Sequence, residues 1–507
     1  MYVSGPEFQT YGFIVVFIIG LFFLVKEIRN KNIKLNFNKI LILIVLLAIV
    51  LRIIVPFVHS YVPDDFWLME EGKNFALDGK TYNCEINDFN EKQCYYFKQP
   101  GHPIIISGVI MLFGLSSLPL FLLNSAASII CILLVYFLAK KIFSEKTALI
   151  SAFLLAVSSR FAVTSNHIEN IIFALMFGLL SMFLFYEYLD SYNLKAKNSH
   201  YLLISATAFF LAAVFTRIEM FSLLLVPIYQ YYKTKNHDIG IAILILLAVM
   251  ILMVMSLKTF DSSSIVINTK FENFGTSITS YIGEAAKTYD FLSNYYKPIF
   301  MIGVSLIALW GFIKTKKREL FISIIPLTLF YIFLFSPHVE ETILIPFAFA
   351  VIYFSDMIGK ITNKKTITIL AILLVIFSLI NINVQAKPLK DKLMVLDKMT
   401  FSELKPNCTV ITERVPLISA LEEVQGIQTY KVYSNKNTRA RILLNDCVLY
   451  FENRYCYENR DIGPALKVDQ EYLDSKSRCE YMKKNLVKEE LDSFEYEGVK
   501  YALYRVK

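Results

Sequence analysis

The chain has 507 residues, of which 55% are hydrophobic and only 19% are charged. A mean hydropathy of +0.50 excludes an ordinary soluble protein of this length. The net charge of +8 comes mostly from loops between apolar segments, so it does not indicate nucleic-acid binding.

Apolar runs long enough to cross a hydrocarbon core of about 30 Å recur throughout residues 1–386. The runs are continuous rather than alternating, and a helix satisfies its backbone polar groups inside lipid, so each run predicts a transmembrane helix. The twelve predicted spans cover residues 11–26, 40–58, 118–139, 147–163, 170–189, 201–215, 219–232, 238–257, 297–313, 319–336, 343–359 and 366–385. The predicted fold is a polytopic all-α membrane domain.

The distribution of lysine and arginine predicts how this domain is oriented. Six loops together hold 19 basic residues against four acidic ones, namely loops 26–39, 140–146, 190–200, 233–238, 314–318 and 360–365. The alternate loops 164–169 and 337–342 hold no lysine or arginine. The positive-inside rule therefore predicts a multi-pass cell-membrane protein whose termini are both extracytoplasmic. Basic residues follow the first apolar run instead of preceding it, which indicates a retained anchor and not a signal peptide.

The first predicted outer loop, residues 59–117, opens with two adjacent carboxylates. They are Asp64 and Asp65 in "YVPDDFWLMEEG", directly after the second span. One interpretation is a catalytic pair that faces the membrane surface. The other is a helix N-cap or loop solvation, because Pro-Asp is a common start for a turn.

The same loop continues with "YYFKQPGHP", which contains Lys98 and His102. The apolar stretch 101–114 follows, and with 14 residues it is too short to span a bilayer, so it predicts an interfacial helix on the outer face. Lys98 is interpreted either as a phosphate-binding cation or as an ordinary solvated loop lysine.

Charged residues also interrupt the apolar sequence at two further outer positions. The loop "SSRFAVTSNHIEN" carries His167 and Glu169, for which the alternatives are an exposed loop histidine and a cap of the following span. "FTRIEMF" places Arg217 and Glu219 inside the almost unbroken apolar stretch 201–232. Charges at such depth line a cavity or pair with each other, so an anion-binding role and a structural ion pair both stay open.

Six of the seven cysteines lie in predicted outer segments, and only Cys131 lies within a span. An oxidising compartment favours disulfides there, most directly between Cys84 and Cys94, although all six could be free thiols. The pairing among the four cysteines of the tail cannot be deduced from the sequence.

Residues 387–507 are polar and mixed in composition. "CTVITE", "IQTYKVY" and "CVLYFENRYC" predict strands, "PLISALEEV" and "SRCEYMKKNLV" predict helices, and "DSFEYEGVKYALYRVK" predicts a closing hairpin. This alternation predicts a soluble extracytoplasmic α/β domain. No glycine-rich phosphate loop occurs in it, so nucleotide binding is not expected.

Over about residues 40–360 the sequence resembles the GT-C glycosyltransferases that use polyprenyl-phosphate sugars, such as protein O-mannosyltransferases and the lipid A aminoarabinose transferase. The stretches that carry the resemblance are "PDDFWLMEEGKNFALDGKTY", "YYFKQPGHPIIISGVIMLFG", "SSRFAVTSNHIEN", "FTRIEMFSLLLVPIY" and "SPHVEETILIPFAFAVIYF". Two departures are Gln99, where a proline is usual, and Thr342, where many relatives carry arginine. The Trp-Trp-Asp motif of oligosaccharyltransferases is missing, because Trp67 and Trp310 are far apart.

The resemblance implies a role for each matching residue. Asp64 would be the general base, with Asp65 beside it and Glu169 as the acid of the second outer loop. Lys98 and Arg217 would bind the donor phosphate. The possible substrate-binding residues are His102, His167, Glu219, His338 and Glu340.

The predicted function is therefore inverting transfer of a single sugar from a polyprenyl- or dolichyl-phosphate donor on the extracytoplasmic face. The acceptor is a lipid-linked glycan, a glycolipid or a protein. No cofactor is required, and a divalent cation on Asp64, Asp65 and Glu169 is possible but not expected. The alternatives are a transporter or flippase of a lipid-linked glycan, which predicts charges near the bilayer midplane, and a scaffold that displays the tail domain.

Overall fold

The computed structural model of the chain divides into two compact units. Unit 1 holds residues 1–55, 97–105 and 121–384, and unit 2 holds 56–96, 106–120 and 385–507. The structure describes residues 5–29, 38–55, 63–86, 92–96, 99–114, 117–194, 200–258, 322, 324, 344–361, 364–398, 409–412, 428–431, 447–452, 456, 479–480, 483–484, 487–496 and 499–506.

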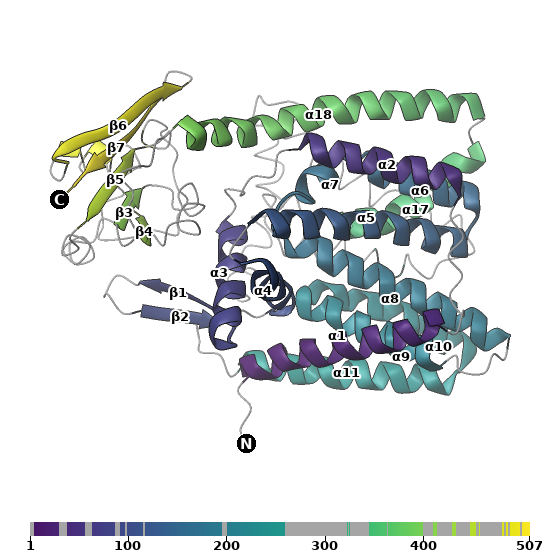
Figure 1. Cartoon of the computed structure of the whole chain (residues 1–507). Helices are drawn as coiled ribbons and strands as arrows, with labels where there is room; N and C mark the ends of the chain where they lie inside the picture. The colour runs from purple at the N-terminus through teal and green to yellow at the C-terminus, as the bar shows by residue number, and fades with distance from the viewer. Residues whose placement is uncertain are drawn as a thin grey trace, which may run out of the picture. The chain divides into compact units, whose positions relative to one another are not determined.

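Unit 1 is built from apolar helices (Figure 1). They are α1 (Gly5–Arg29), α2 (Lys39–Ile54), α5 (Ser117–Ile142), α6 (Glu145–Ala156), α7 (Ser159–Thr164), α8 (Asn170–Asn193), α9 (His200–Thr216), the 3₁₀ helix η1 (Ile218–Leu224), α10 (Leu225–Thr234), α11 (His237–Lys258), α17 (Leu344–Ile361) and most of α18 (Lys364–Lys398). Helix α9 packs against both α8 and α1, and α6 packs against α2 and α17.

Aromatic side chains fill the contact between α1, α8 and α9. The Phe177 ring lies 5.7 Å from Phe17 and 6.1 Å from Phe209, measured between centroids. Other apolar side chains, among them Leu43 on α2 and Leu373 on α18, are exposed. An exposed apolar face on such a helix is suited to contact lipid.

Among the described residues, four helices are long and apolar enough to cross a bilayer, and they lie at 9–29, 118–142, 170–193 and 365–382. This confirms the multi-pass membrane protein that the composition predicts. The total of twelve spans stays a prediction, because the expected spans 297–313 and 319–336 lie essentially outside the described residues.

Two of the expected spans differ from a single continuous helix. Residues 147–163 divide into α6 and α7, because the Ser158 side chain accepts a hydrogen bond from the Phe161 N–H and starts a new helix. Residues 219–232 begin as η1 and become α-helical only at Leu225. The second irregular point contains Glu219, a residue of the candidate site described below.

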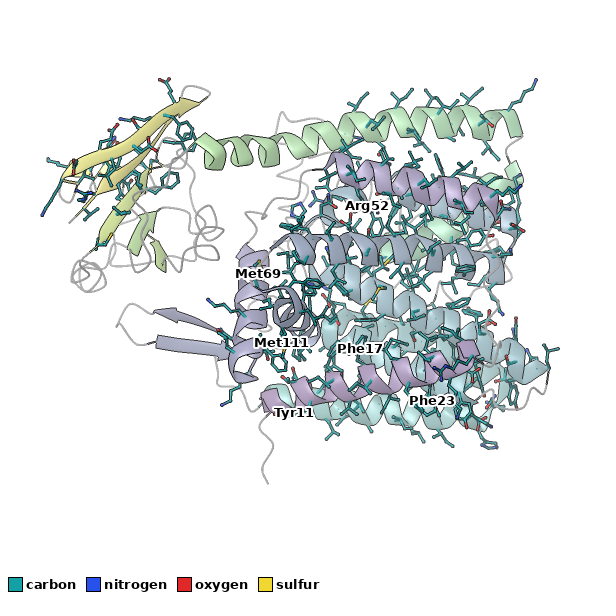
Figure 2. All side chains as sticks on the ribbon, in the orientation of Figure 1. Tyr11, Phe17, Phe23, Arg52, Met69 and Met111 are labelled. Carbon is teal, nitrogen blue, oxygen red and sulfur yellow. A yellow bond between two sulfur atoms is a disulfide. The ribbon has the colours of Figure 1, made fainter. Side chains whose placement is uncertain are left out.

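The interfacial helix that the sequence predicts is α4 (Gly101–Phe113), and it ends where Gly114 adopts a φ of +75°. Its last turn exposes Met111, which Figure 2 labels, together with Leu112 and Phe113. A short helix with an exposed apolar end is consistent with a position at a lipid surface.

The N-terminal part of unit 2 contains α3 (Pro63–Asp78) and a hairpin of β1 (Tyr82–Ile86) with β2 (Lys92–Tyr96). Gly79 follows α3 with a φ of +74°, a left-handed conformation that favours glycine at the end of a helix. In the hairpin register Cys84 lies directly opposite Cys94. The predicted disulfide between them stays a prediction.

The C-terminal part of unit 2 is a five-stranded mixed sheet of order β4-β3-β5-β7-β6. The strands are β3 (Thr409–Thr412), β4 (Gln428–Lys431), β5 (Val448–Glu452), β6 (Glu489–Tyr496) and β7 (Val499–Arg505). The four β-segments expected in the tail are therefore present, including the closing hairpin. The helix expected at 416–424 lies outside the described residues, so the α/β assignment stays a prediction. The domain boundary expected at 386/387 also stays a prediction, and helix α18 crosses it.

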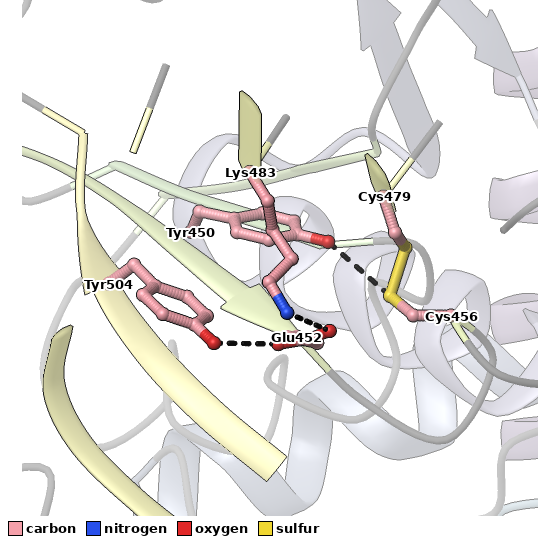
Figure 3. Close-up of a disulfide and its surroundings, with 6 residues drawn as sticks. All are labelled: Tyr450, Glu452, Cys456, Cys479, Lys483 and Tyr504. Atoms are coloured by element: carbon pink, nitrogen blue, oxygen red, sulfur yellow. Dashed lines mark hydrogen bonds and ion pairs between the residues drawn. A yellow bond between two sulfur atoms is a disulfide. The ribbon is translucent and has the colours of Figure 1, made fainter. Parts of the chain in front are cut away.

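A disulfide between Cys456 and Cys479 fixes the core of this sheet (Figure 3). Beside it the buried Glu452 carboxylate accepts hydrogen bonds from Lys483 Nζ at 3.0 Å and Tyr504 Oη at 2.7 Å. The Cys456–Cys479 disulfide agrees with the oxidised tail cysteines that the sequence predicts. Among the described residues, Cys131 is the free thiol.

Candidate functional site

The first component of the candidate site is the start of α8. Glu169 precedes the helix and is only 6% exposed, and its side chain makes no capping hydrogen bond to α8. Glu169 therefore occupies the N-cap position, as one interpretation of the sequence expects, but its carboxylate does not cap the helix by a hydrogen bond. An ionised carboxylate at this point is still favoured by the helix dipole, because the N-terminus carries partial positive charge.

The second component is the turn between α9 and η1. Arg217 interrupts the helix with an extended φ of −150°, and its Nη2 donates to Glu219 Oε1 at 2.7 Å. Its Nη1 donates to Asn170 Oδ1 at 2.8 Å, which joins this turn to the start of α8. The side chains of Glu219 and Arg217 are 2% and 12% exposed, so the ion pair is largely buried.

Close contacts with small residues bring these elements together. A Cβ atom on Gly101 would lie 2.5 Å from Thr216 Oγ1 and 2.9 Å from the Phe13 ring, so α4 begins in direct contact with the end of α9. A Cβ atom on Gly178 would lie 2.2 Å from the end of Met220, which packs η1 against α8. Glycine at both positions therefore permits the approach that places Arg217 beside Asn170.

His102 belongs to the same cluster. Its imidazole is 2% exposed and lies 5.2 Å from the Phe173 ring, one turn into α8. Within the described part of the chain its Nδ1 has no hydrogen-bond partner. Burial lowers the pKa of the His102 imidazole to about 3, so the ring is neutral at pH 7 and cannot serve as a fixed positive charge.

The buried His102 gives a pH-dependent stability. In the unfolded chain its pKa is about 6.5, so between about pH 6.5 and pH 3 the unfolded state binds more protons and stability falls as the pH falls. We expect acidification from pH 7 to 4.5 to lower the free energy of unfolding by about 2 kcal/mol more in the native chain than in His102→Phe. Thermal unfolding in detergent measures this, with the exposed His237→Phe as control. The prediction is contradicted if the stability of the native chain and that of His102→Phe fall equally between about pH 7 and 4.5.

The remaining predicted site residues lie elsewhere. Asp64 and Asp65 lie in the first turn of α3, a position at which the helix dipole favours acidic residues. This helix belongs to unit 2. Their convergence with Glu169 stays a prediction. Lys98, His338 and Glu340 lie outside the described residues.

His167 is only half-buried, and its main-chain carbonyl accepts a hydrogen bond from Asn124 Nδ2. Its substrate-binding role stays a prediction. Sequence reasoning missed Asn170, whose only signal is a polar residue next to Glu169 at the start of an apolar run.

Together these groups form a largely buried polar cluster at the helix ends of unit 1. It contains a cation, two carboxylates, an amide and a neutral imidazole, namely Arg217, Glu169, Glu219, Asn170 and His102. Such a set can hold an anion and accept hydrogen bonds from sugar hydroxyls. Among the residues described, no group of three or more potential metal-ligating side chains occurs, and metal independence stays a prediction.

Residues 98–258 match the model of a family described as dolichyl-phosphate-mannose-protein mannosyltransferase. This segment includes the whole of the polar cluster. A comparison with curated proteins gives no match.

Among solved structures, ArnT from Cupriavidus metallidurans, crystallised with undecaprenyl phosphate, is similar with a TM-score of 0.50 and 10% identity. The similarity covers 92% of this chain and 98% of ArnT. The oligosaccharyltransferase of Archaeoglobus fulgidus, tethered to an acceptor peptide, gives a TM-score of 0.48 and 14% identity over 77% of this chain. The chain spans 63% of that enzyme's length. The family match and the ArnT fold confirm the resemblance to GT-C glycosyltransferases.

Proposed function

We propose that this protein transfers a single sugar, with inversion, from a polyprenyl- or dolichyl-phosphate donor to an acceptor on the extracytoplasmic face of the membrane. The acceptor is a lipid-linked glycan, a glycolipid or a protein. The observation that carries the proposal is the buried Arg217–Glu219–Asn170 cluster next to Glu169, within the segment that matches the mannosyltransferase family model.

In this reaction Asp64 removes the proton from the acceptor hydroxyl as its oxygen attacks the anomeric carbon. The bond from that carbon to the donor phosphate breaks, and its electron pair leaves with the phosphate. Because the leaving group is already an anion, it needs neutralisation by cations more than it needs an acid. Lys98 and Arg217 supply the positive charge, while Asp65 and Glu169 accept hydrogen bonds from hydroxyl groups.

The ion pair with Glu219 is compatible with a phosphate-binding role for Arg217. A guanidinium has five N–H donors, so it can bind a carboxylate and a phosphate at the same time. Glu219 also offsets the cost of placing the cation at membrane depth while the donor is absent. We therefore assign Glu219 and Asn170 the task of orienting the guanidinium toward the donor.

A transporter or flippase of a lipid-linked glycan is the competing proposal. It also accounts for a buried charge pair, but it gives no reason for a match to a transferase family over residues 98–258. The two proposals differ in what happens to the donor, because transport leaves the bond between sugar and phosphate intact.

The experiment uses the full-length protein in lipid nanodiscs with polyprenyl-phosphate sugars labelled in the sugar and a membrane lipid extract as acceptor. We expect the label to move to an acceptor and free polyprenyl phosphate to accumulate, whereas nucleotide sugars give no transfer. Movement of intact donor across sealed vesicles without cleavage would replace the transferase proposal with the transporter.

A further inference from the structure

A network of buried polar side chains surrounds the loop between α7 and α8, which ends at Glu169. Asn166 lies in this loop and is 1% exposed. Its Nδ2 donates to the carbonyl oxygens of Arg52 at 2.7 Å and Val55 at 2.8 Å, at the end of α2. Its Oδ1 accepts from Ser125 Oγ at 2.7 Å. All three contacts of the amide therefore tie the loop to neighbouring helices.

Helix α5 holds the backbone of the same loop. Asn124 Nδ2 donates to the carbonyl oxygens of His167 and, at 3.4 Å, Thr164. Ser125 Oγ also lies 3.2 Å from the Ser165 carbonyl oxygen. Buried non-helical backbone is costly unless its polar groups are hydrogen-bonded. Asn124 and Ser125 hydrogen-bond three carbonyl groups within residues 164–167 and so restrain the backbone of the loop.

Arg52, labelled in Figure 2, anchors the other side of the network. Its guanidinium is 2% exposed, with Nε 2.6 Å from Ser128 Oγ on α5 and Nη1 2.9 Å from the Ala48 carbonyl oxygen. Ser128 Oγ in turn donates to the Ser125 carbonyl oxygen at 2.6 Å. The carbonyls to which Asn166 binds therefore belong to a helix end that is itself fixed to α5.

We infer that Asn166, supported by Asn124 and Ser125, is a positioning residue that fixes Glu169 for sugar transfer. Glu169 follows Asn166 by three residues, and the next residue, Asn170, is held by Arg217. The loop is thus fixed on both sides of Glu169. Both polar atoms of the Asn166 amide have partners, and such a buried hydrogen-bonded amide specifies one conformation, which a hydrophobic contact does less well. The inference rests on the proposed function for what Glu169 does, but not for how it is held.

The test compares Asn166→Ala with Asn236→Ala in full-length protein in nanodiscs. Asn236 is a matched control, because it is 4% exposed and also makes three side-chain contacts, with Tyr188 Oη and with the N–H groups of Asp238 and Ile239. We expect Asn166→Ala to lower kcat by about 10- to 100-fold, because misplacing a reacting group by about 1 Å has effects of this size. Asn236→Ala is expected to lower the thermal midpoint similarly while kcat changes by less than about twofold.

Two readouts separate positioning from general stability. In the Glu169→Gln background, Asn166→Ala is expected to lower kcat by less than about threefold, because residues that act through each other are not additive. Hydrogen exchange at residues 164–170 is expected to increase in Asn166→Ala and not in Asn236→Ala. Equal losses of kcat in both backgrounds, or unchanged exchange in that loop, would overturn the inference.

The outcome distinguishes this inference from the proposed function. If the native protein transfers no sugar, the proposed function fails, and the exchange at residues 164–170 alone decides whether Asn166 fixes the loop. If the native protein transfers sugar and Asn166→Ala does so at the native kcat, only the positioning role fails. Ser125→Ala removes a single hydroxyl and replaces Asn166→Ala in every comparison should that variant not fold, with an expected loss in kcat of about threefold or more.

Discussion

Replacing Asp64 by asparagine is expected to lower kcat for sugar transfer by about 10²- to 10⁴-fold, which is the range that a positioned general base contributes. Asparagine preserves the shape of the side chain but cannot accept the proton of the acceptor hydroxyl. The KM for the polyprenyl-phosphate donor is expected to change by less than about threefold, because a base acts on the acceptor and not on the phosphate. Steady-state kinetics with labelled donor measures both quantities.

Asp78→Asn is the matched control, since Asp78 ends the same helix α3 whose first turn contains Asp64. It removes one negative charge from that helix and is expected to leave kcat within about twofold. Asp65→Asn separates the two neighbouring carboxylates and is expected to lower kcat less than Asp64→Asn does. Transfer by Asp64→Asn at the native rate refutes the base assignment and returns Asp64 to a helix-end or solvation role.

The sequence predicted the elements of unit 1 well, because long apolar runs leave a chain few alternatives in lipid. The run that starts at Asn170 became α8, and the 14-residue stretch 101–114 became the short helix α4. Composition alone therefore located the helices that carry the candidate site. It could not show the division of residues 147–163, because that break depends on one hydrogen bond to Ser158.

Side-chain partners were less predictable. Arg217 and Glu219 stand two residues apart, a spacing that does not bring side chains together on an α-helix. They meet because the backbone leaves α9 at Arg217 and enters η1, which sequence patterns do not specify. Asn166 was not identified at all, because an asparagine in a loop is ordinary until the carbonyls of α2 lie within reach of its amide.

The buried ion pair yields the second large effect. Glu219→Gln is expected to destabilise the protein by about 3 to 5 kcal/mol, because it removes the carboxylate that pairs with the largely buried Arg217 cation, and Arg217→Gln is expected to act likewise on the buried Glu219. The double variant Arg217→Gln/Glu219→Gln removes both charges and is expected to recover most of this loss. Denaturation followed by intrinsic fluorescence in detergent measures the three stabilities.

The double variant also separates the two interpretations of the pair, because it keeps the fold while it lacks the cation. If Arg217 binds the donor phosphate, the double variant raises the donor KM by about 10- to 100-fold, the value of one or two charge-assisted hydrogen bonds. The matched control is Lys141→Gln/Glu187→Gln, which removes an ion pair of 2.8 Å from the other end of α8. If the double variant is stable and keeps the native donor KM, the role of the Arg217–Glu219 pair is purely structural. The general-base assignment of Asp64 would be unaffected, since it rests on proton transfer and not on phosphate binding.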